Sequence, residues 1–406
     1  MARHLANTRI VNLSPVSRRE FLRRSGALIA GVSLNGLPNP ARFAQDKADP
    51  IVKQVNRAID QYMQDMQDQA PIGLAVAIVR PGTTPDQPVV NTFFRGEVQL
   101  GGKQLPDEKT IFELGSISKI FTASLLADMV FNQKLLKLED DVQPYYDKLA
   151  PNSVALPTYH GKTIKFWHLA THTAGFPDDP PNLKAGGPCL YTTQLMYKAL
   201  DALELPEAPG ETASYSNLGF AILADVLMLI SNGKSVEDVI QAFFNRAKLN
   251  LLDTHIMTAD FSDSRFAQGY FTEKGSIKPK QANQCMPTWP AFDGAGALHS
   301  TLTDMIEWLK FNLQLLKSPL NNVPTEAIKP LHDFIKDEKI GLGWQLKPLK
   351  AKPGSYSVNK DGETLGFNTQ IVFFPPTRTG AVALTNTAGS NPAMLNANLI
   401  EILNSN

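Results

Sequence analysis

Strand-like segments at both ends of this 406-residue chain limit its fold more than any other feature. Residues 72–79 are apolar and rich in β-formers, and after a Pro/Gly-rich turn residues 89–94 continue as a hairpin. Three further segments suit successive antiparallel strands: 356–359, 368–374 and 380–385. Between the two groups the pattern is mostly helical. We therefore expect one antiparallel sheet built from both chain ends, with a helical insertion at roughly 120–340.

Amphipathic segments flank the predicted strands. Apolar residues recur at helical spacing over 50–67 and again over 392–403. A third amphipathic segment covers residues 301–316, and its expected N-terminal cap is Thr301 or Thr303. The fold class is therefore α/β of the α+β type, an antiparallel sheet flanked by helices.

The first 44 residues have the order of a targeting signal. Ser17-Arg18-Arg19-Glu20-Phe21-Leu22-Arg23-Arg24 is a twin-arginine pattern, and residues 26–37 are a short, mildly apolar stretch. That stretch is too short to span a bilayer. A disordered basic tail is the alternative, but it leaves this order unexplained. We predict export to the periplasm or the exterior, with residues 45–406 as one domain and cleavage near Ala41 or Ala44.

Loss of residues 1–44 changes the charge balance. That segment contains seven of the 39 basic residues and one of the 39 acidic residues, so 32 basic and 38 acidic residues remain, a net charge of −6. No basic patch remains to bind nucleic acid or an anionic membrane. Apolar runs such as residues 218–230 are too short for stable membrane insertion.

The two cysteines, Cys189 and Cys285, match no metal-site spacing. In an exported protein they can form one disulfide or remain two free thiols, and the sequence leaves both open.

Ser116 and Lys119 form a Ser-x-x-Lys pair before an apolar run, 120–135. If that run is a helix, the two side chains leave one face of its first turn. A serine hydroxyl needs a base, and a partly buried lysine with a lowered pKa can supply it. Gly115 leaves room for close backbone approach. The alternative is an exposed Ser and Lys that open an amphipathic helix.

Two further motifs follow at wide spacing. Tyr215-Ser216-Asn217 precedes an apolar helix, and the alternative is a packed Tyr with Asn217 as the helix cap. Lys360-Asp361-Gly362 lies at the end of a predicted strand, where Asp-Gly alone would indicate an ordinary hairpin turn.

Together, Ser-x-x-Lys, Tyr-x-Asn and Lys-x-Gly in this order resemble class C β-lactamases and the penicillin-binding D,D-peptidases. Phe112-Glu-Leu-Gly-Ser-Ile-Ser-Lys119 reproduces the class C signature, and His168-Leu-Ala-Thr-His-Thr-Ala-Gly175 is similar to the helix and turn before the substrate loop. The resemblance covers nearly all of residues 50–405.

The resemblance implies a role for each motif residue. Ser116 is the expected acylated nucleophile, and Lys119 and Tyr215 are expected to share the general-base work. Lys360 would lower the pKa of the tyrosine and attract an anionic substrate. The expected substrate-binding groups are Asn217, Gly362, Glu363 and Asn391. The backbone N–H groups of Ser116 and Glu363 would form the oxyanion hole.

Some positions depart from the class C pattern. Asp361 replaces the usual threonine, whose hydroxyl contacts the carboxylate of a β-lactam, and Met394 replaces an arginine. Gly296 stands in place of a tyrosine, and Pro177-Asp178-Asp179 lacks the usual glutamine. We expect an aspartate that points into the site to repel a carboxylate substrate.

The sequence therefore predicts a serine hydrolase that works through an acyl-enzyme on a small amide or ester. β-Lactam hydrolysis of the class C type is the preferred activity. The alternatives are a related esterase, a D-amino-acid peptidase or D,D-carboxypeptidase, and a penicillin-binding sensor without turnover. No cofactor or metal is expected, because His168 and His172 lack the glutamate of a metalloprotease helix.

Overall fold

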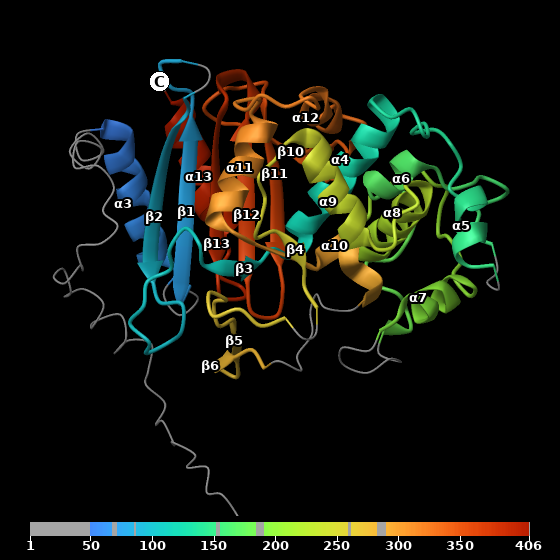
Figure 1. Ribbon diagram of the computed structural model, residues 1–406, viewed down its shortest axis with the longest axis horizontal. Coiled ribbons are helices and arrows are strands. Elements are labelled where there is room, and N and C mark those ends of the chain that lie inside the picture. The colour runs from blue at the N-terminus through green and yellow to red at the C-terminus, as the bar shows by residue number, and fades with distance from the viewer. Residues whose placement is uncertain are drawn as a thin grey trace, which may run out of the picture. The chain divides into compact units, whose positions relative to one another are not determined.

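Eight antiparallel strands form the central sheet of the computed structural model, which describes residues 49–66, 71–84, 87–151, 155–183, 191–258, 261–281 and 290–405 (Figure 1). In spatial order they are β2 (Val89–Gly96), β1 (Gly73–Arg80), β13 (Thr379–Thr385), β12 (Asn368–Phe374), β11 (Tyr356–Glu363), β10 (Gln345–Pro348), β9 (Lys339–Ile340) and β8 (His332–Asp333). Strand β1 pairs with β13 from Leu74↔Thr385 to Val79↔Gly380. The predicted sheet built from both chain ends is confirmed.

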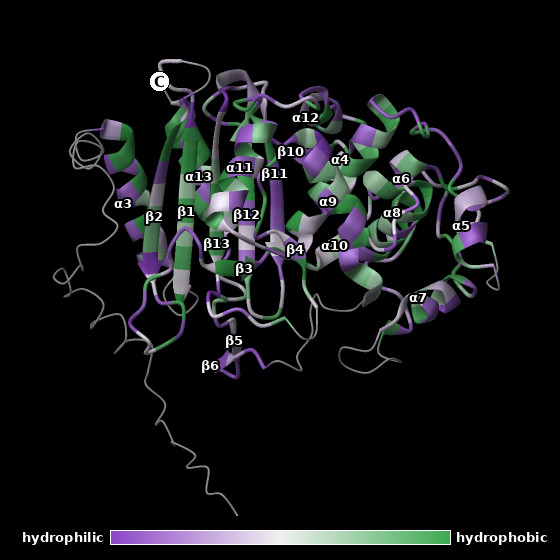
Figure 2. Ribbon diagram, in the orientation of Figure 1, coloured by the Kyte–Doolittle hydropathy of each residue, from purple (hydrophilic) through white to green (hydrophobic). Residues whose placement is uncertain are grey.

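Side chains alternate between the two faces of β1, as a strand requires. Leu74, Val76 and Ile78 belong to one buried cluster, together with side chains of α3 (Pro50–Asp65) and α13 (Pro392–Asn404). Alternate residues of the strand belong to the second and larger cluster, which includes the apolar face of α11 (Leu302–Asn312). The sheet is therefore covered by helices on both faces, and Figure 2 shows the apolar colouring along β1.

Side-chain caps mark the N-termini of two of these flanking helices, α3 and α11. The Asp49 side chain accepts a hydrogen bond from Ile51 N at 2.8 Å, and Pro50 is the first residue of α3. Of the two threonines that the sequence offered for α11, Thr301 is the cap, because its hydroxyl accepts from Asp304 N. The predicted helices at both chain ends are confirmed.

The insertion between β2 and β8 is mainly helical. Besides α11, its α-helices in the described residues are α4 (Ser118–Phe131), α5 (Gln143–Leu149), α6 (Phe166–Ala170), α7 (Thr193–Leu200), α8 (Asn217–Ile230), α9 (Val236–Ala247), α10 (Asp293–Gly296) and α12 (Asn322–Ala327). It also contains a small sheet of β3 (Ile111–Glu113), β7 (Leu298–Thr301) and β4 (His255–Ile256), and a hairpin of β5 (Tyr270–Glu273) and β6 (Ser276–Pro279). Strands of two to four residues are too short to give a readable alternation, so the sequence did not predict them.

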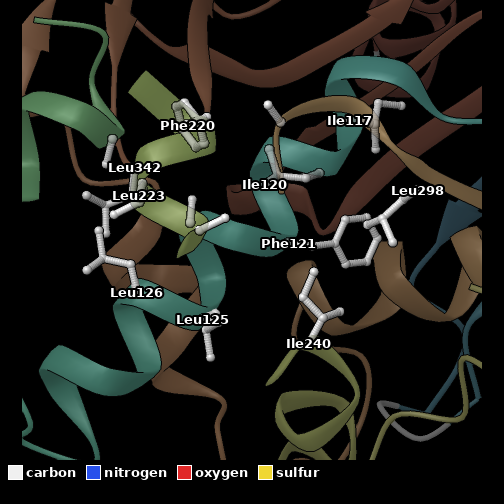
Figure 3. Close-up of a cluster of buried hydrophobic side chains, with 14 of the residues drawn as sticks. Ile117, Ile120, Phe121, Leu125, Leu126, Phe220, Leu223, Ile240, Leu298 and Leu342 are labelled. Atoms are coloured by element: carbon white, nitrogen blue, oxygen red, sulfur yellow. The ribbon is translucent and has the colours of Figure 1, made fainter. Parts of the chain in front are cut away.

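Helix α4 is buried on nearly every side. The Phe121 ring stacks on Trp308 of α11 with their centroids 4.2 Å apart, and Figure 3 shows Phe121 beside Leu298 and Ile240. A helix that is apolar all round lies in the core of a protein. This packing holds the N-terminus of α4, and with it Ser116 and Lys119, in a fixed place.

Within the described ranges, no helix has both the length and the apolar character that a membrane crossing needs. The twin-arginine segment, Cys189 and Cys285 lie outside the described residues, so the expectations about export and a disulfide stay predictions.

Candidate active site

Ser116 lies in a short turn between a strand and a helix. Gly115–Ile117 form one 3₁₀ turn, η2, which joins β3 to α4. The sequence placed Ser116 in the first turn of the α-helix itself, but the helix begins at Ser118. The chain turns sharply here because Gly115 has φ +55°, a left-handed conformation that favours glycine. The turn is fastened by the Ser118 hydroxyl, which donates to Gly115 O at 2.7 Å.

Lys119 projects toward Ser116 from the first turn of α4 and is completely buried. Its Nζ donates to Ser116 Oγ at 3.0 Å, to Asn217 Oδ1 at 2.6 Å and to Ala295 O at 2.7 Å. Burial lowers the pKa of this amine, the charge of Tyr215 opposes that effect, and the Lys360 cation lowers the pKa further. The net effect is a pKa below the usual lysine value.

Tyr215 approaches Ser116 from the loop before α8. Its hydroxyl donates to Ser116 Oγ at 2.6 Å. The phenol ring lies against the His172 imidazole, with ring centroids 4.4 Å apart. His172 Nδ1 in turn accepts from Ser216 N at 3.1 Å, and burial keeps the pKa of His172 well below its usual value. The neutral imidazole of His172 therefore packs against the ring of Tyr215.

Lys360 brings a second buried cation to the same group. Its Nζ lies 5.1 Å from the centroid of the Tyr215 ring, and the Lys119 Nζ lies 4.9 Å from it. Burial lowers the pKa of Lys360, and the charge of Asp361 opposes that shift. The ammonium groups of Lys119 and Lys360 therefore both make cation–π contacts with the ring of Tyr215.

The Lys360–Gly362 motif is part of strand β11, which runs on to Glu363. The alternative reading of Asp361-Gly362 as a hairpin turn is therefore wrong. Gly362 is needed where β11 crosses the serine turn, because a Cβ there would lie 1.9 Å from Leu114 O. The backbone of Glu363 packs equally closely on Gly115, whose own Cβ would lie 2.7 Å from Glu363 N.

Asn217 is the first residue of α8, and Ser216 caps that helix by accepting from Gly219 N at 2.9 Å. The reading of Asn217 as the cap is therefore wrong, and its amide is available to the site. While its oxygen accepts from Lys119, its nitrogen donates to Asp178 Oδ1 at 2.9 Å and to Asp179 Oδ1 at 3.1 Å. The amide is thus fixed in one orientation.

The remaining predicted residues lie around a hollow outside β11. Asp361, Glu363 and Asn391 all line it, and its volume is about 330 Å³. The Asp361 carboxylate is half-exposed and lies 3.9 Å from Lys360 Nζ. The Lys360 cation lowers the pKa of Asp361 below its usual value, so the side chain carries a negative charge at neutral pH.

Several residues of the site were not predicted. Ala295 contributes only its carbonyl to Lys119, a role that any residue type can play, so no sequence signal marks it. The His172 ring packs against Tyr215, whereas the sequence suggested for it only a place in a helix and turn and a metal-ligand role that was rejected. The acidic pair 178–179 was noted only as a departure, yet two carboxylates near an amide are its expected hydrogen-bond acceptors.

His168 in helix α6 and His172 in the turn after it both have structural partners. His168 Nδ1 accepts from Lys165 N at 3.0 Å, and His172 Nδ1 accepts from Ser216 N. Over the described part of the chain, no group of three or more His, Cys, Asp or Glu side chains is placed to hold a metal ion.

A serine hydroxyl between a buried lysine and a tyrosine, at the edge of an antiparallel sheet flanked by helices, is typical of serine hydrolases that form acyl-enzymes. A sequence model of the beta-lactamase family matches residues 55–403, which is most of the chain. The protein belongs to the beta-lactamase family and is a serine hydrolase of that family.

Relatives in sequence include two kinds of enzyme. D-alanyl-D-alanine-carboxypeptidase/endopeptidase AmpH of Escherichia coli K12 is 30% identical over 304 residues, which cover 70% of this chain and 73% of AmpH. A beta-lactamase of Escherichia coli K12 is 27% identical over 381 residues, which cover 85% of this chain and 92% of that protein.

Solved structures show the same fold. A class C beta-lactamase superposes with a TM-score of 0.71 at 20% identity, over 87% of this chain and 97% of that one. A beta-lactamase/D-alanine carboxypeptidase from Yersinia pestis, complexed with citrate, superposes with a TM-score of 0.68 at 22% identity over the same shares. The predicted fold class is confirmed.

Replacement of Gly362 tests how tightly β11 packs on the serine turn. Gly362→Ala would place a methyl group 1.9 Å from Leu114 O, so β11 or the turn must move. We expect turnover of an ester substrate to fall at least tenfold, since a displacement of about 1 Å can cost 10²-fold.

Gly219→Ala is the matched control, because its Cβ would have only ordinary contacts, the nearest at 3.5 Å. In helix α8 the alanine should leave activity unchanged and stabilise the fold by about 0.4–1 kcal/mol. Equal activity of the two variants would contradict the close packing at Gly362.

Proposed function

We propose that this protein hydrolyses small amides or esters through an acyl-enzyme on Ser116. The observation that carries the proposal is the convergence of two polar groups on one hydroxyl. Ser116 Oγ lies 3.0 Å from the buried Lys119 Nζ and 2.6 Å from Tyr215 Oη. Both distances are within the reach that a general base needs.

In the first step, Ser116 Oγ attacks the substrate carbonyl carbon, and its proton passes to the Lys119–Tyr215 pair. The carbonyl electrons move onto the oxygen. The backbone N–H groups of Ser116 and Glu363 are the proposed donors to that oxyanion, each worth roughly 3–4 kcal/mol in the transition state. The bond to the leaving nitrogen or oxygen then breaks, and the leaving group takes the proton from the pair.

In the second step, a water molecule attacks the acyl carbon and gives its proton to the same pair. The bond from that carbon to Ser116 Oγ breaks, the carboxylic acid leaves, and the serine regains its proton. Lys360 is not needed as a base in this scheme. Its buried charge lowers the pKa of Lys119.

For the substrate, we propose that neutral esters and amides are turned over better than β-lactams. The beta-lactamase relatives support β-lactam hydrolysis, and AmpH supports the peptidase alternative. β-Lactams and D-alanyl-D-alanine peptides both carry a carboxylate on the leaving side, so the negative charge of Asp361, which takes the place of the class C threonine, disfavours both relative to neutral esters and amides. A penicillin-binding sensor without turnover remains the third possibility, and measured turnover would exclude it.

We also propose that residues 1–44 direct the chain out of the cytoplasm and that residues 45–406 form the hydrolase domain. The order of the twin-arginine pattern and the short apolar stretch supports this proposal.

Ser116→Ala tests the nucleophile. The variant should lose both turnover of p-nitrophenyl esters and covalent labelling by a fluorophosphonate or a penicillin. Because the change removes only one hydroxyl oxygen, stability should stay within about 1 kcal/mol. Intact-protein mass spectrometry gives the readout, and an adduct on the variant would disprove the assignment.

The pH dependence of acylation tests the base. Because burial and Lys360 lower the pKa of Lys119, acylation should rise with pH through a midpoint below 10.5, the ordinary lysine value. Lys119→Arg, which stays protonated, should acylate about 10²- to 10⁴-fold more slowly.

Lys360→Met removes the cation that helps to deprotonate Lys119. The rising limb should therefore move to higher pH, as rates of ester acylation measured across the pH range would show. A limb that does not move would contradict the coupling between the two lysines.

Asp361→Thr tests substrate choice. The change removes a negative charge and adds a hydroxyl donor, so kcat/KM on a chromogenic cephalosporin should rise about tenfold, or 1.4 kcal/mol. Turnover of a neutral p-nitrophenyl ester should change much less. Asp60→Asn, on helix α3, is the control for a lost surface charge. Rapid wild-type turnover of the cephalosporin would show that Asp361 does not repel the substrate.

A further inference from the structure

The hollow outside β11 contains more carboxylates than the reaction at Ser116 requires. Its charged lining consists of Glu338, Lys347, Asp361 and Glu363. Among the described residues that line it, Lys347 alone is cationic. Asp361 and Glu363 are exposed and alternate along β11 with the buried Lys360 and Gly362, so they project together on the open side of the strand.

These carboxylates are only partly neutralised. Lys347 Nζ lies 3.9 Å from Glu338 Oε1, and within the described residues Glu363 makes no ion pair. Burial raises the pKa of Glu338, Lys347 opposes that effect, and the negative charge of Asp361 raises the pKa further. Like charges that repel one another across an open hollow would be stabilised by a cation between them.

A buried acceptor in the same hollow points to a ligand that donates hydrogen bonds. Gln345 lines the hollow and is only 9% exposed. Its Oε1 is buried and has no hydrogen-bond donor within the described part of the chain. A buried acceptor left unpaired costs about 1–3 kcal/mol. An N–H group brought by a ligand would remove that cost.

Lys360 links the hollow to the serine. Its Nζ lies 3.9 Å from the Asp361 carboxylate and 5.1 Å from the centroid of the Tyr215 ring, and the Tyr215 hydroxyl donates to Ser116 Oγ at 2.6 Å. On one side, Lys360 to Glu363 pair with β12, from Lys360↔Ile371 to Glu363↔Asn368. On the other side, the pairing with β10 ends at Gln345↔Asn359, so this stretch of β11 has a free edge. The exposed Ile335 adds an apolar wall that can hold methylene groups.

We propose that this hollow binds an ammonium group on the leaving part of the substrate, an inference that rests on the proposed reaction at Ser116. Asp361 stands where the related enzymes contact the carboxylate of a β-lactam, and that carboxylate is on the nitrogen side of the bond that breaks. Here the same position carries a negative charge in place of a neutral hydroxyl. The leaving group is therefore an amine or alcohol that bears a second, positively charged nitrogen with N–H donors.

Three aryl acetates with leaving groups of similar size test the proposal. They are 4-(aminomethyl)phenyl acetate, which is cationic, 4-ethylphenyl acetate, which is neutral, and 4-(carboxymethyl)phenyl acetate, which is anionic. Each kcat/KM is divided by the rate of alkaline hydrolysis of the same ester. The cationic ester should exceed the neutral one by about fivefold or more, and the anionic ester should be the slowest. The preference should weaken as salt is added.

Variants assign the preference to the hollow. Asp361→Asn with Glu363→Gln should bring the ratio of cationic to neutral ester close to one. Lys347→Gln should raise that ratio, because it removes the cation that lines the hollow. Asp60→Asn, a carboxylate on the distant helix α3, should leave the ratio unchanged. A wild-type ratio near one, or a ratio that the double variant keeps, would overturn the proposal.

A binding measurement separates this proposal from the acyl-enzyme itself. If no ester reacts at Ser116, the proposed function fails, and the hollow is tested on Ser116→Ala, which cannot turn the ester over. Calorimetric titration with 4-(aminomethyl)phenyl acetate should show at least about fivefold weaker binding once Asp361→Asn and Glu363→Gln are added. Equal affinities would overturn the proposal. If the double change unfolds the protein, the two single variants replace it.

Discussion

The burial of the Lys119 ammonium is the constraint on which the site depends. A charge taken out of water is costly unless it is surrounded by hydrogen-bond acceptors. Here three elements supply them: the serine turn through Ser116, helix α8 through Asn217, and α10 through the Ala295 carbonyl. The lysine therefore joins three parts of the fold, and the same desolvation that makes it costly lowers its pKa toward the range of a useful base.

The charges around the serine are arranged in two layers. The cations, Lys119 and Lys360, are buried, while the carboxylates of Asp178, Asp361 and Glu363 are exposed. Buried charges act on nearby groups through a low dielectric, whereas exposed ones act mainly on what approaches from solvent. The buried cations are therefore suited to influence the reacting groups, and the exposed carboxylates are suited to influence which substrate binds.

The sequence predicted the parts of this protein that follow a local rule. Long strands such as β1 are apolar almost throughout, and the helices at both chain ends have regular spacing, so their bounds were found within a few residues. The Ser-x-x-Lys, Tyr-x-Asn and Lys-x-Gly motifs were recognised because their order and side-chain chemistry are visible in the sequence, and the structure brings Ser116, Lys119, Tyr215 and Lys360 into one group. Tertiary contacts decided the rest. The contact of the Ala295 carbonyl with Lys119 and the packing of His172 on Tyr215 join segments that are far apart in the sequence. Asp361 lies within a strand because β11 continues its pairing with β12 as far as Glu363.

The pairing of β1 with β13 has a consequence for how the chain acquires its fold. Gly73 N donates to Asn386 Oδ1 at 2.6 Å, across 313 residues of sequence. When the N-terminal hairpin leaves the ribosome, the strand that completes its sheet has not yet been made, and one edge of β1 stays open. Contacts of such long range must close a large loop before they stabilise anything, and proteins rich in them fold slowly. We therefore expect the nascent chain to expose an aggregation-prone edge through nearly all of its synthesis, and a premature stop near the C-terminus to be far more damaging than the loss of a terminal helix alone would imply.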